Sequence, residues 1–197
     1  MSTPSQSATT SFRPWYRTRL VRPERPGRAY GVVVPETPLL ANALPRVDWS
    51  DAYAVTFPGR PPGNPQEWAD AIFHSPPWWV AALFGVREIL VRLVGIESGD
   101  SHAFDTVDWI PDEVLVGIDQ RHLSFRASVL QERRRVVLTT VVQVHNRRGR
   151  AYSAVVRRVH PFVVRGMLAR AARTMAASTG TAGPAHWSTS SNREEDP

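Results

Sequence analysis

The apolar residues change period within residues 122–175, and this change sets the fold class. Alternation with period two over 122–130, 136–144 and 150–160 is typical of half-buried β-strands, whereas the stripe with period 3.6 over 161–175 is typical of an amphipathic α-helix. Each element then has one apolar face, and such faces pack against each other. We therefore predict an α+β protein in which a C-terminal helix lies across a sheet, with a core and a ligand site between them.

The two ends of the chain differ from its middle. Residues 1–28 and 176–197 are rich in Ser, Thr and Pro and have no apolar periodicity. They contain too few apolar groups to offset the entropy lost on ordering, so we expect flexible tails. Residues 29–175 then form a single domain, which is long enough to bury a sizeable core.

The composition excludes several kinds of chemistry. The 197 residues include no cysteine, which excludes disulfides, thiolate metal sites and cysteine nucleophiles. All 24 basic residues are arginine, so Schiff-base chemistry on lysine is excluded too. The net charge of +6 raises the question of nucleic acid, but the arginines are spread among 18 acidic residues, which argues against that partner. No metal-binding or cofactor-binding motif is present, and we predict no cofactor.

No segment has the pattern of a signal peptide or a membrane anchor. The N-terminal residues have neither a basic start nor an apolar run, so we expect a cytoplasmic protein. The apolar run 78–96 contains Arg87, Glu88 and Arg92, and each charge costs roughly 2.5–3.5 kcal/mol at the centre of a spanning helix. We therefore predict no membrane insertion and assign this run to a buried helix.

Turn and cap residues predict one strand and two helices upstream of the sheet segments. The strand covers 47–57, and the Pro- and Gly-rich loop after it can continue neither a strand nor a helix. Asn64, Pro65 and Glu67 have the spacing of a capping box at the start of a short helix. The remaining expected elements are a longer helix over 75–93 and strands over 112–119 and part of 103–110.

Two turns set the expected registers of the sheet. A loop of even length joins 122–130 to 136–144 and brings both apolar sets to one face. A second hairpin loop is expected over 146–149, because Gly149 stands where such a loop favours a left-handed residue. This loop would make 150–160 the partner strand of 136–144.

His160 is the strongest candidate for a polar group in the ligand site. It directly precedes Pro161 at the expected start of the helix, and it shares the inward strand parity of Tyr152 and Arg158. These three residues are candidate acid/base or oxyanion-stabilising groups. The alternative, to which we give more weight, is that His160 only satisfies backbone groups at the helix start.

Other polar residues are weaker candidates. His122, Ser124 and Arg126 alternate on one side of a strand, and we expect them to face solvent rather than to form a polar site. Asp48 and Asp51 are three residues apart in the first strand, so they point to opposite faces. That spacing argues against a pair of carboxylates in acid/base catalysis.

A family resemblance covers about residues 45–175. The runs HLSFRASV and TTVVQVHNRRGRAYSAVVRRVHPFVV, with VDWSDAYAV and PPWWVAALFGVREILVRLVG upstream, resemble bacterial proteins of domain of unknown function 2867. The resemblance implies a START-like helix-grip fold of the SRPBCC superfamily, in which a curved antiparallel sheet wraps a long C-terminal helix and two short helices follow the first strand. The family tends to have an acidic residue where this chain has Ser124, so no role of that carboxylate carries over.

Three functions are compatible with this sequence. The leading hypothesis is a binding protein for a small apolar or amphipathic molecule held between sheet and helix. The second is an enzyme similar to the polyketide cyclases and hydratases of the superfamily, and the third is an interaction module with a solid core. The sequence leaves the oligomeric state open. The expected ligand-binding residues are Phe125, Leu138, Val142, Tyr152, His160, Val164, Met167 and Leu168.

Overall fold

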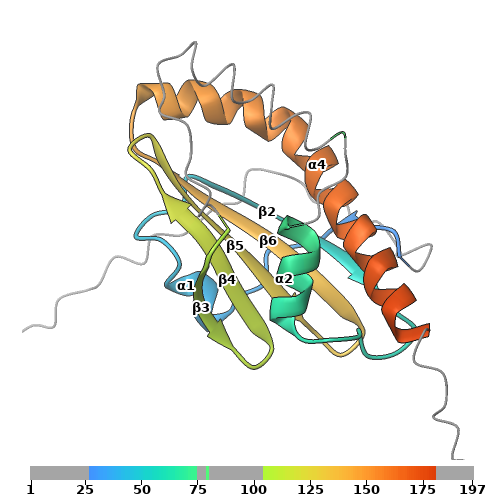
Figure 1. The fold of residues 1–197 in the computed structure, drawn as a ribbon. Coiled ribbons are helices and arrows are strands. Elements are labelled where there is room, and N and C mark those ends of the chain that lie inside the picture. Colours follow the sequence, from blue (N-terminus) through green and yellow to red (C-terminus); the bar gives the residue numbers. More distant parts are fainter. Residues whose placement is uncertain (1–26, 75–78, 80–103, 181–197) are drawn as a thin grey trace, which may run out of the picture.

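The computed structural model describes residues 27–74, residue 79 and residues 104–180 of the chain (Figure 1). The described strands form one antiparallel sheet in the order β1-β2-β6-β5-β4-β3, and the longest helix follows the last strand. The predicted α+β class, with a C-terminal helix on a curved antiparallel sheet, is confirmed. The described elements are β1 (Tyr30–Gly31), α1 (Pro38–Ala41), β2 (Trp49–Thr56), α2 (Pro65–Phe73), β3 (Thr106–Ile110), β4 (Glu113–Asp119), β5 (Leu123–Gln131), β6 (Arg135–Val144) and α4 (Arg147–Gly180).

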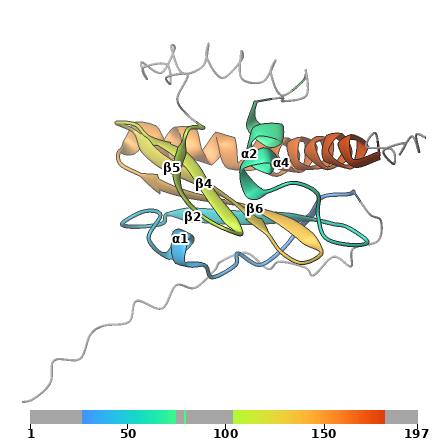
Figure 2. The same ribbon diagram turned by 60° about the horizontal axis from the view of Figure 1, so that its bottom comes forward.

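The two faces of the sheet are covered differently. Helices α2 and α4 lie on one face, and α1 with the N-terminal chain lies on the other (Figures 1 and 2). We call the first the helix face, and we call the second the strap face after residues 32–48, the strap that crosses it. The main core lies between the helix face and the two helices, and its largest members are Tyr53, Val55, Trp68, Ile72, Val129, Leu138, Val164, Met167 and Leu168.

The hairpin of β5 and β6 brings the two predicted apolar sets to one face. Phe125 pairs with Val142, and Val129 pairs with Leu138, so both sets lie on the helix face. The turn between the strands is closed by the Glu132 N–H, which donates to the Arg135 carbonyl at 2.8 Å. Its centre lies at Arg133 and Arg134, one residue later than the expected centre at Glu132 and Arg133. Residue parity therefore predicts the shared face of this pair, while the exact register depends on the turn.

The predicted strand 150–160 is wrong, because these residues form the N-terminal half of α4. Asn146 caps this helix: its Oδ1 accepts a hydrogen bond from the Gly149 N–H at 2.9 Å, and its carbonyl accepts one from the Arg150 N–H at 3.0 Å. The run rich in Ala, Arg and Val fits a helical period as well as a strand period. Pro161 lies inside the helix, where its missing N–H breaks one backbone hydrogen bond, and α4 curves along its length (Figure 1).

Gly149 does not have the left-handed conformation that the hairpin required. Among the described glycines, Gly27 and Gly63 have positive φ, and Gly149 does not. Glycine is required at 149 for a different reason, since a Cβ there would lie 2.1 Å from the backbone oxygen of His122. The helix start can therefore pack on the β4–β5 turn only without a side chain at this position.

We expect Gly149→Val to lower the free energy of unfolding by about 2 kcal/mol, because backbone atoms of two segments must move apart to admit the side chain. Urea denaturation of the full chain measures the change. Gly59→Val is the matched control, since no atom lies within 4 Å of an added Cβ at that loop position. Equal unfolding midpoints for the two variants would contradict the packing of Gly149 on His122.

The predicted capping box begins α2. The Asn64 Oδ1 accepts a hydrogen bond from the Glu67 N–H at 3.0 Å, and the Asn64 amide donates to Glu67 Oε1 at 2.7 Å. Pro65 occupies the first turn, as predicted. The longer helix expected over 75–93 lies outside the described residues except for Trp79, and the two predicted tails lie almost wholly outside them, with α4 continuing to Gly180.

Candidate functional site

A histidine and a carboxylate meet between the helix face and α4. The Nδ1 of His160, on α4, lies 2.9 Å from Oδ2 of Asp51, on β2, and about four-fifths of each side chain is buried. The Tyr53 hydroxyl donates to the same carboxylate oxygen at 3.3 Å. An ionised carboxylate can only accept hydrogen bonds, so His160 Nδ1 carries the proton in this pair. The lone pair of the neutral imidazole is then on Nε2.

Aromatic and cationic groups surround this pair. The Trp49 ring meets the His160 ring edge to face, with 5.3 Å between their centroids. The guanidinium of Arg157 lies 5.9 Å from the Trp49 ring centroid, and that of Arg165 lies 5.0 Å from the centroid of the Tyr53 ring. Cations at these distances are attracted to the faces of the rings. Asp51 therefore lies between the rings of Trp49 and Tyr53, and each ring contacts an arginine side chain. We call Trp49, Asp51, Tyr53 and His160 the sheet–helix cluster.

Two polar atoms of this cluster are buried without a hydrogen-bond partner in the described part of the chain. They are Trp49 Nε1 and Asp51 Oδ1. A buried polar atom without a partner costs about 1–3 kcal/mol and calls for an explanation, which can be a functional one. The donor on Trp49 and the acceptor on Asp51 match a small polar group that both accepts and donates.

The structure brings one of the three candidate catalytic residues into this cluster. His160 belongs to it, whereas Tyr152 packs against the apolar cluster around Trp49 and Arg158 is exposed, and a catalytic role of these residues stays a prediction. In a helix, eight residues separate Tyr152 from His160 by about 12 Å along the axis and about 80° around it. Tyr152 packs against His122, with 5.6 Å between the ring centroids, and Arg158 is exposed and donates to the Ala154 carbonyl.

Asp51 is the functional residue that the sequence reasoning missed. The prediction that Asp48 and Asp51 point to opposite faces is confirmed, since Asp48 hydrogen-bonds at the end of β6 while Asp51 faces α4. The partner of Asp51 is 109 residues away along the chain, so spacing carried no signal of the pair. A carboxylate on the inward parity of an otherwise apolar strand was the signal available.

The predicted apolar ligand residues all lie along the contact between the helix face and α4. Leu138, Val164, Met167 and Leu168 belong to the main core. Val142 packs with Trp49, and Phe125 and Tyr152 border that smaller cluster. These residues form an apolar layer on both sides of His160, and their contact with a ligand remains a prediction.

The strap face contains a second polar network. Ser124 and Arg126 are buried there, His122 is buried against Tyr152 of α4, and the prediction that these three residues face solvent is wrong. Apolar residues of the strap, including Leu39 and Leu40, pack onto this face of the sheet. A sheet in which both faces are covered buries both alternating sets of residues.

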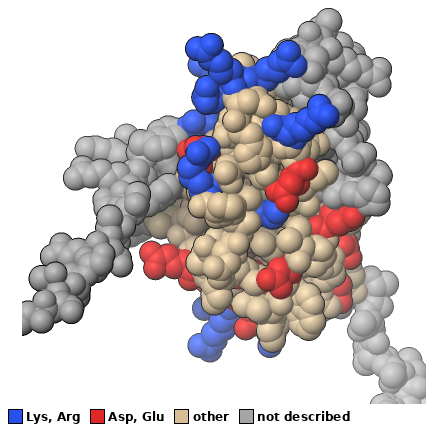
Figure 3. All heavy atoms as spheres, turned by 90° about the vertical axis from the view of Figure 1, so that its left-hand side faces the viewer, with Lys and Arg blue, Asp and Glu red and all other residues tan. Residues whose placement is uncertain are grey.

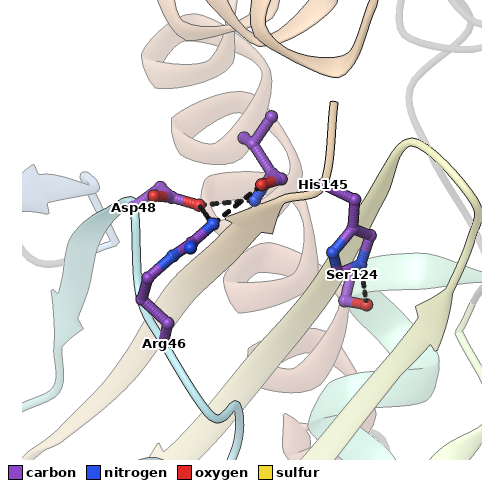
Figure 4. Close-up of polar contacts among 5 residues, drawn as sticks. Arg46, Asp48, Ser124 and His145 are labelled. Carbon is purple, nitrogen blue, oxygen red and sulfur yellow. Dashed lines mark hydrogen bonds and ion pairs between the residues drawn. The ribbon is translucent and has the colours of Figure 1, made fainter. Parts of the chain in front are cut away.

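The contacts of this network fasten the end of β6. Ser124 Oγ lies 2.9 Å from His145 Nε2 (Figure 4). On the other side of the strand end, Asp48 accepts a hydrogen bond from the Val144 N–H at 2.6 Å and forms an ion pair with Arg46 at 3.1 Å (Figure 4). A serine paired with a histidine resembles a nucleophile and its base, but Ser124 is buried. This arrangement joins β5, β6 and the strap.

Two acidic residues on the strap face have different partners. The hydrogen bond from the Arg126 guanidinium, at 2.8 Å, lowers the pKa of Asp119. Burial opposes this effect, and a hydrogen bond from Ser124 adds to it. Glu113 is fully buried and accepts hydrogen bonds from the hydroxyls of Thr37, at 2.9 Å, and Ser128. Thr37 also caps α1, so Glu113 anchors the strap.

The fold and site define an α+β protein in which one long C-terminal helix closes a polar cluster against an antiparallel sheet. The chain belongs to the family described as protein of unknown function (DUF2867), whose model matches residues 43–167. The resemblance noted in the sequence is thereby confirmed for the family. No curated protein and no solved structure matches the chain.

The described residues contain neither a metal-binding group nor a membrane-spanning helix. They contain no group of three or more His, Cys, Asp or Glu side chains arranged to hold a metal ion. None of their helices is long and apolar enough to cross a membrane.

Proposed function

We propose that this protein binds a small amphipathic molecule between the helix face and α4. The observation that carries the proposal is the pair of buried polar atoms without partners on Trp49 and Asp51, which are joined through His160. A hydroxyl or amide group of a ligand would accept from the Trp49 N–H and donate to the Asp51 carboxylate. Such a group would remove the cost of burying these atoms.

The apolar part of the ligand would lie along α4. Val164 and Met167 follow His160 on the buried side of the helix, and Met167 is about 10 Å further along the axis. Phe125 and Val142 face α4 from the sheet. Apolar surface removed from water contributes roughly 25 cal/mol per Å², so the apolar chain would supply most of the affinity. The resemblance to START-like helix-grip proteins supports the same location.

We expect a dansyl-labelled fatty alcohol to bind the full chain saturably, and Met167→Trp to weaken this binding at least about tenfold, because the larger side chain takes up space between sheet and helix. Fluorescence titration measures the affinity, and circular dichroism confirms that the variant is folded. Thr174→Trp, at an exposed position of the same helix, should leave the affinity unchanged. If the wild-type protein shows no saturable uptake, the proposed binding function is wrong.

A second function is favoured by the geometry of Asp51 and His160. The carboxylate holds the imidazole by Nδ1, which leaves Nε2 as a base for proton transfer. We propose, as the alternative, an enzyme that activates water with His160 Nε2, similar to the hydratases of the superfamily that the sequence resembles. Tyr53 and Asp51 would then orient the imidazole, and the two buried polar atoms on Trp49 and Asp51 would hold the polar group of the substrate.

A further inference from the structure

The charge on α4 has one sign. This helix contains eight of the 24 arginines of the chain and no Asp or Glu. Seven of the eight are exposed, and one, Arg157, is partly buried. Figure 3 shows basic side chains gathered at the top of the molecule, where the N-terminal half of α4 lies in Figure 1, and acidic side chains lower down. The N-terminal half of α4 therefore presents a positive surface.

The arginines at the start of α4 are not explained by helix stability. The first turn contains Arg147, Arg148 and Arg150 and no acidic residue. Positive charge at a helix N-terminus opposes the helix macrodipole and is unfavourable. The placement of Arg147 and Arg150 is better explained by an anionic partner outside the protein.

An apolar stripe lies on the same helix, on the side away from the sheet. Val155, Val159 and Phe162 have the spacing i, i+4, i+7 and are 57%, 44% and 69% exposed. The buried stripe of α4, including Val164 and Leu168, lies on the opposite side. We call Val155, Val159 and Phe162 the outer stripe.

The outer stripe has defined limits and basic flanks. At its C-terminal end the chain itself covers the helix, since a Cβ on Gly166 would lie 2.4 Å from the Trp79 ring. Exposed Arg148, Arg158 and Arg165 lie before, within and beyond the stripe. An apolar stripe surrounded by arginines on a helix surface is the pattern of helices that lie in a membrane interface.

We propose that the outer face of the N-terminal half of α4 docks on the surface of an anionic lipid bilayer. The outer stripe would enter the interfacial region, while the arginines contact lipid phosphates. The helix would lie flat on the surface without spanning it. This proposal is independent of the proposed ligand site, which is on the opposite side of α4.

Charge complementarity favours this occupant over two others. A second copy of the chain packed through the same face would bring two helices with eight arginines each together, and their repulsion opposes such a dimer. Nucleic acid would satisfy the arginines, but it would leave Phe162 and the two valines beside a phosphate backbone. A bilayer interface accommodates both the charges and the apolar side chains.

Co-sedimentation of the full chain with vesicles tests the proposal. We expect binding to phosphatidylcholine vesicles that contain 30% (about one lipid in three) phosphatidylglycerol, and at least about tenfold weaker binding to vesicles of pure phosphatidylcholine. The triple variant Val155→Ser, Val159→Ser, Phe162→Ser should bind the anionic vesicles about tenfold more weakly than wild type. Reversing Arg148 and Arg158 to Glu should weaken binding about fivefold per position, an effect that added salt reduces.

A matched control uses apolar residues exposed elsewhere. Val107 and Trp109 on β3 are 50% and 69% exposed, and replacing both with Ser should leave vesicle binding unchanged. Equal binding to neutral and anionic vesicles, or unchanged binding of the triple variant, would overturn the proposal. If the triple variant unfolds several-fold more easily than wild type, the outer stripe packs against the chain itself. If wild type is a dimer and the triple variant is a monomer, the outer stripe is the contact with a second copy. Tighter binding to a DNA duplex, unaffected by the triple variant, would assign the arginines to nucleic acid.

Discussion

Replacing Trp68 with alanine is expected to lower the free energy of unfolding by about 3–5 kcal/mol, the largest effect that we predict for a single substitution in this fold. The Trp68 side chain is fully buried between α2, the sheet and α4. Its ring meets Phe57 edge to face at 5.5 Å, and its Nε1 donates to the Pro62 carbonyl at 2.7 Å. The variant loses apolar burial and leaves this carbonyl without its donor.

Urea denaturation of the full chain measures this loss, and Trp109→Ala is the control. Trp109 has the same side chain but is 69% exposed on β3, so its removal should change the free energy of unfolding by less than about 0.5 kcal/mol. A loss below about 1 kcal/mol for Trp68→Ala would show that α2 is not part of the cooperative core. That result would also remove the support for the helix layer over the sheet.

The parts of the fold that depend on local patterns could be predicted from the sequence. The capping box at Asn64 and the shared apolar face of β5 and β6 follow from local patterns, so their residues alone specify them. The alternation over 150–160 is compatible with two periods, and local pattern cannot choose between them. The choice of helix depends on the cap at Asn146 and on packing against β2, which are visible only in three dimensions.

The wrong prediction for Ser124 and Arg126 has one cause, which is that the sequence does not predict the strap over the second face of the sheet. Ser124 and Arg126 would face solvent if the sheet were covered on one side only, as we assumed. The strap has little periodicity in its sequence, so its position over the second face could not be inferred. Once the strap is in place, the carboxylate of Glu113 and the guanidinium of Arg126 become buried groups that need partners.

The site could be predicted in part for a similar reason. His160 is a candidate site residue because it lies where the strand period of the apolar residues changes to the helical period. The structure places its side chain against the sheet, beside Asp51. Its partner Asp51 and its neighbour Trp49 lie more than a hundred residues earlier in the chain. Contacts over such separations depend on the topology of the fold, and the local pattern of one sequence does not specify them.

The substitution His160→Ala is expected to separate the two proposed functions. A binding protein should keep most of its affinity for the dansyl-labelled fatty alcohol, because the two polar atoms proposed to hold the ligand lie on Trp49 and Asp51. An enzyme that uses His160 Nε2 as its base should keep that affinity and lose turnover by roughly a hundredfold. Addition of water to an α,β-unsaturated thioester, followed by absorbance, is a suitable assay for hydratase-type turnover.

His145→Ala is the matched control, since it removes an imidazole from the strap face and leaves the sheet–helix cluster intact. Asp51→Asn adds a second test, because an amide can donate to His160 as well as accept from it and no longer requires the proton on Nδ1. In the enzyme this variant should lower turnover, and nitrogen NMR should show the imidazole tautomers redistributing. Turnover that survives both His160→Ala and Asp51→Asn would exclude the His160 imidazole as the base. A wild-type protein that binds the alcohol but has no turnover would leave binding as the function of this site.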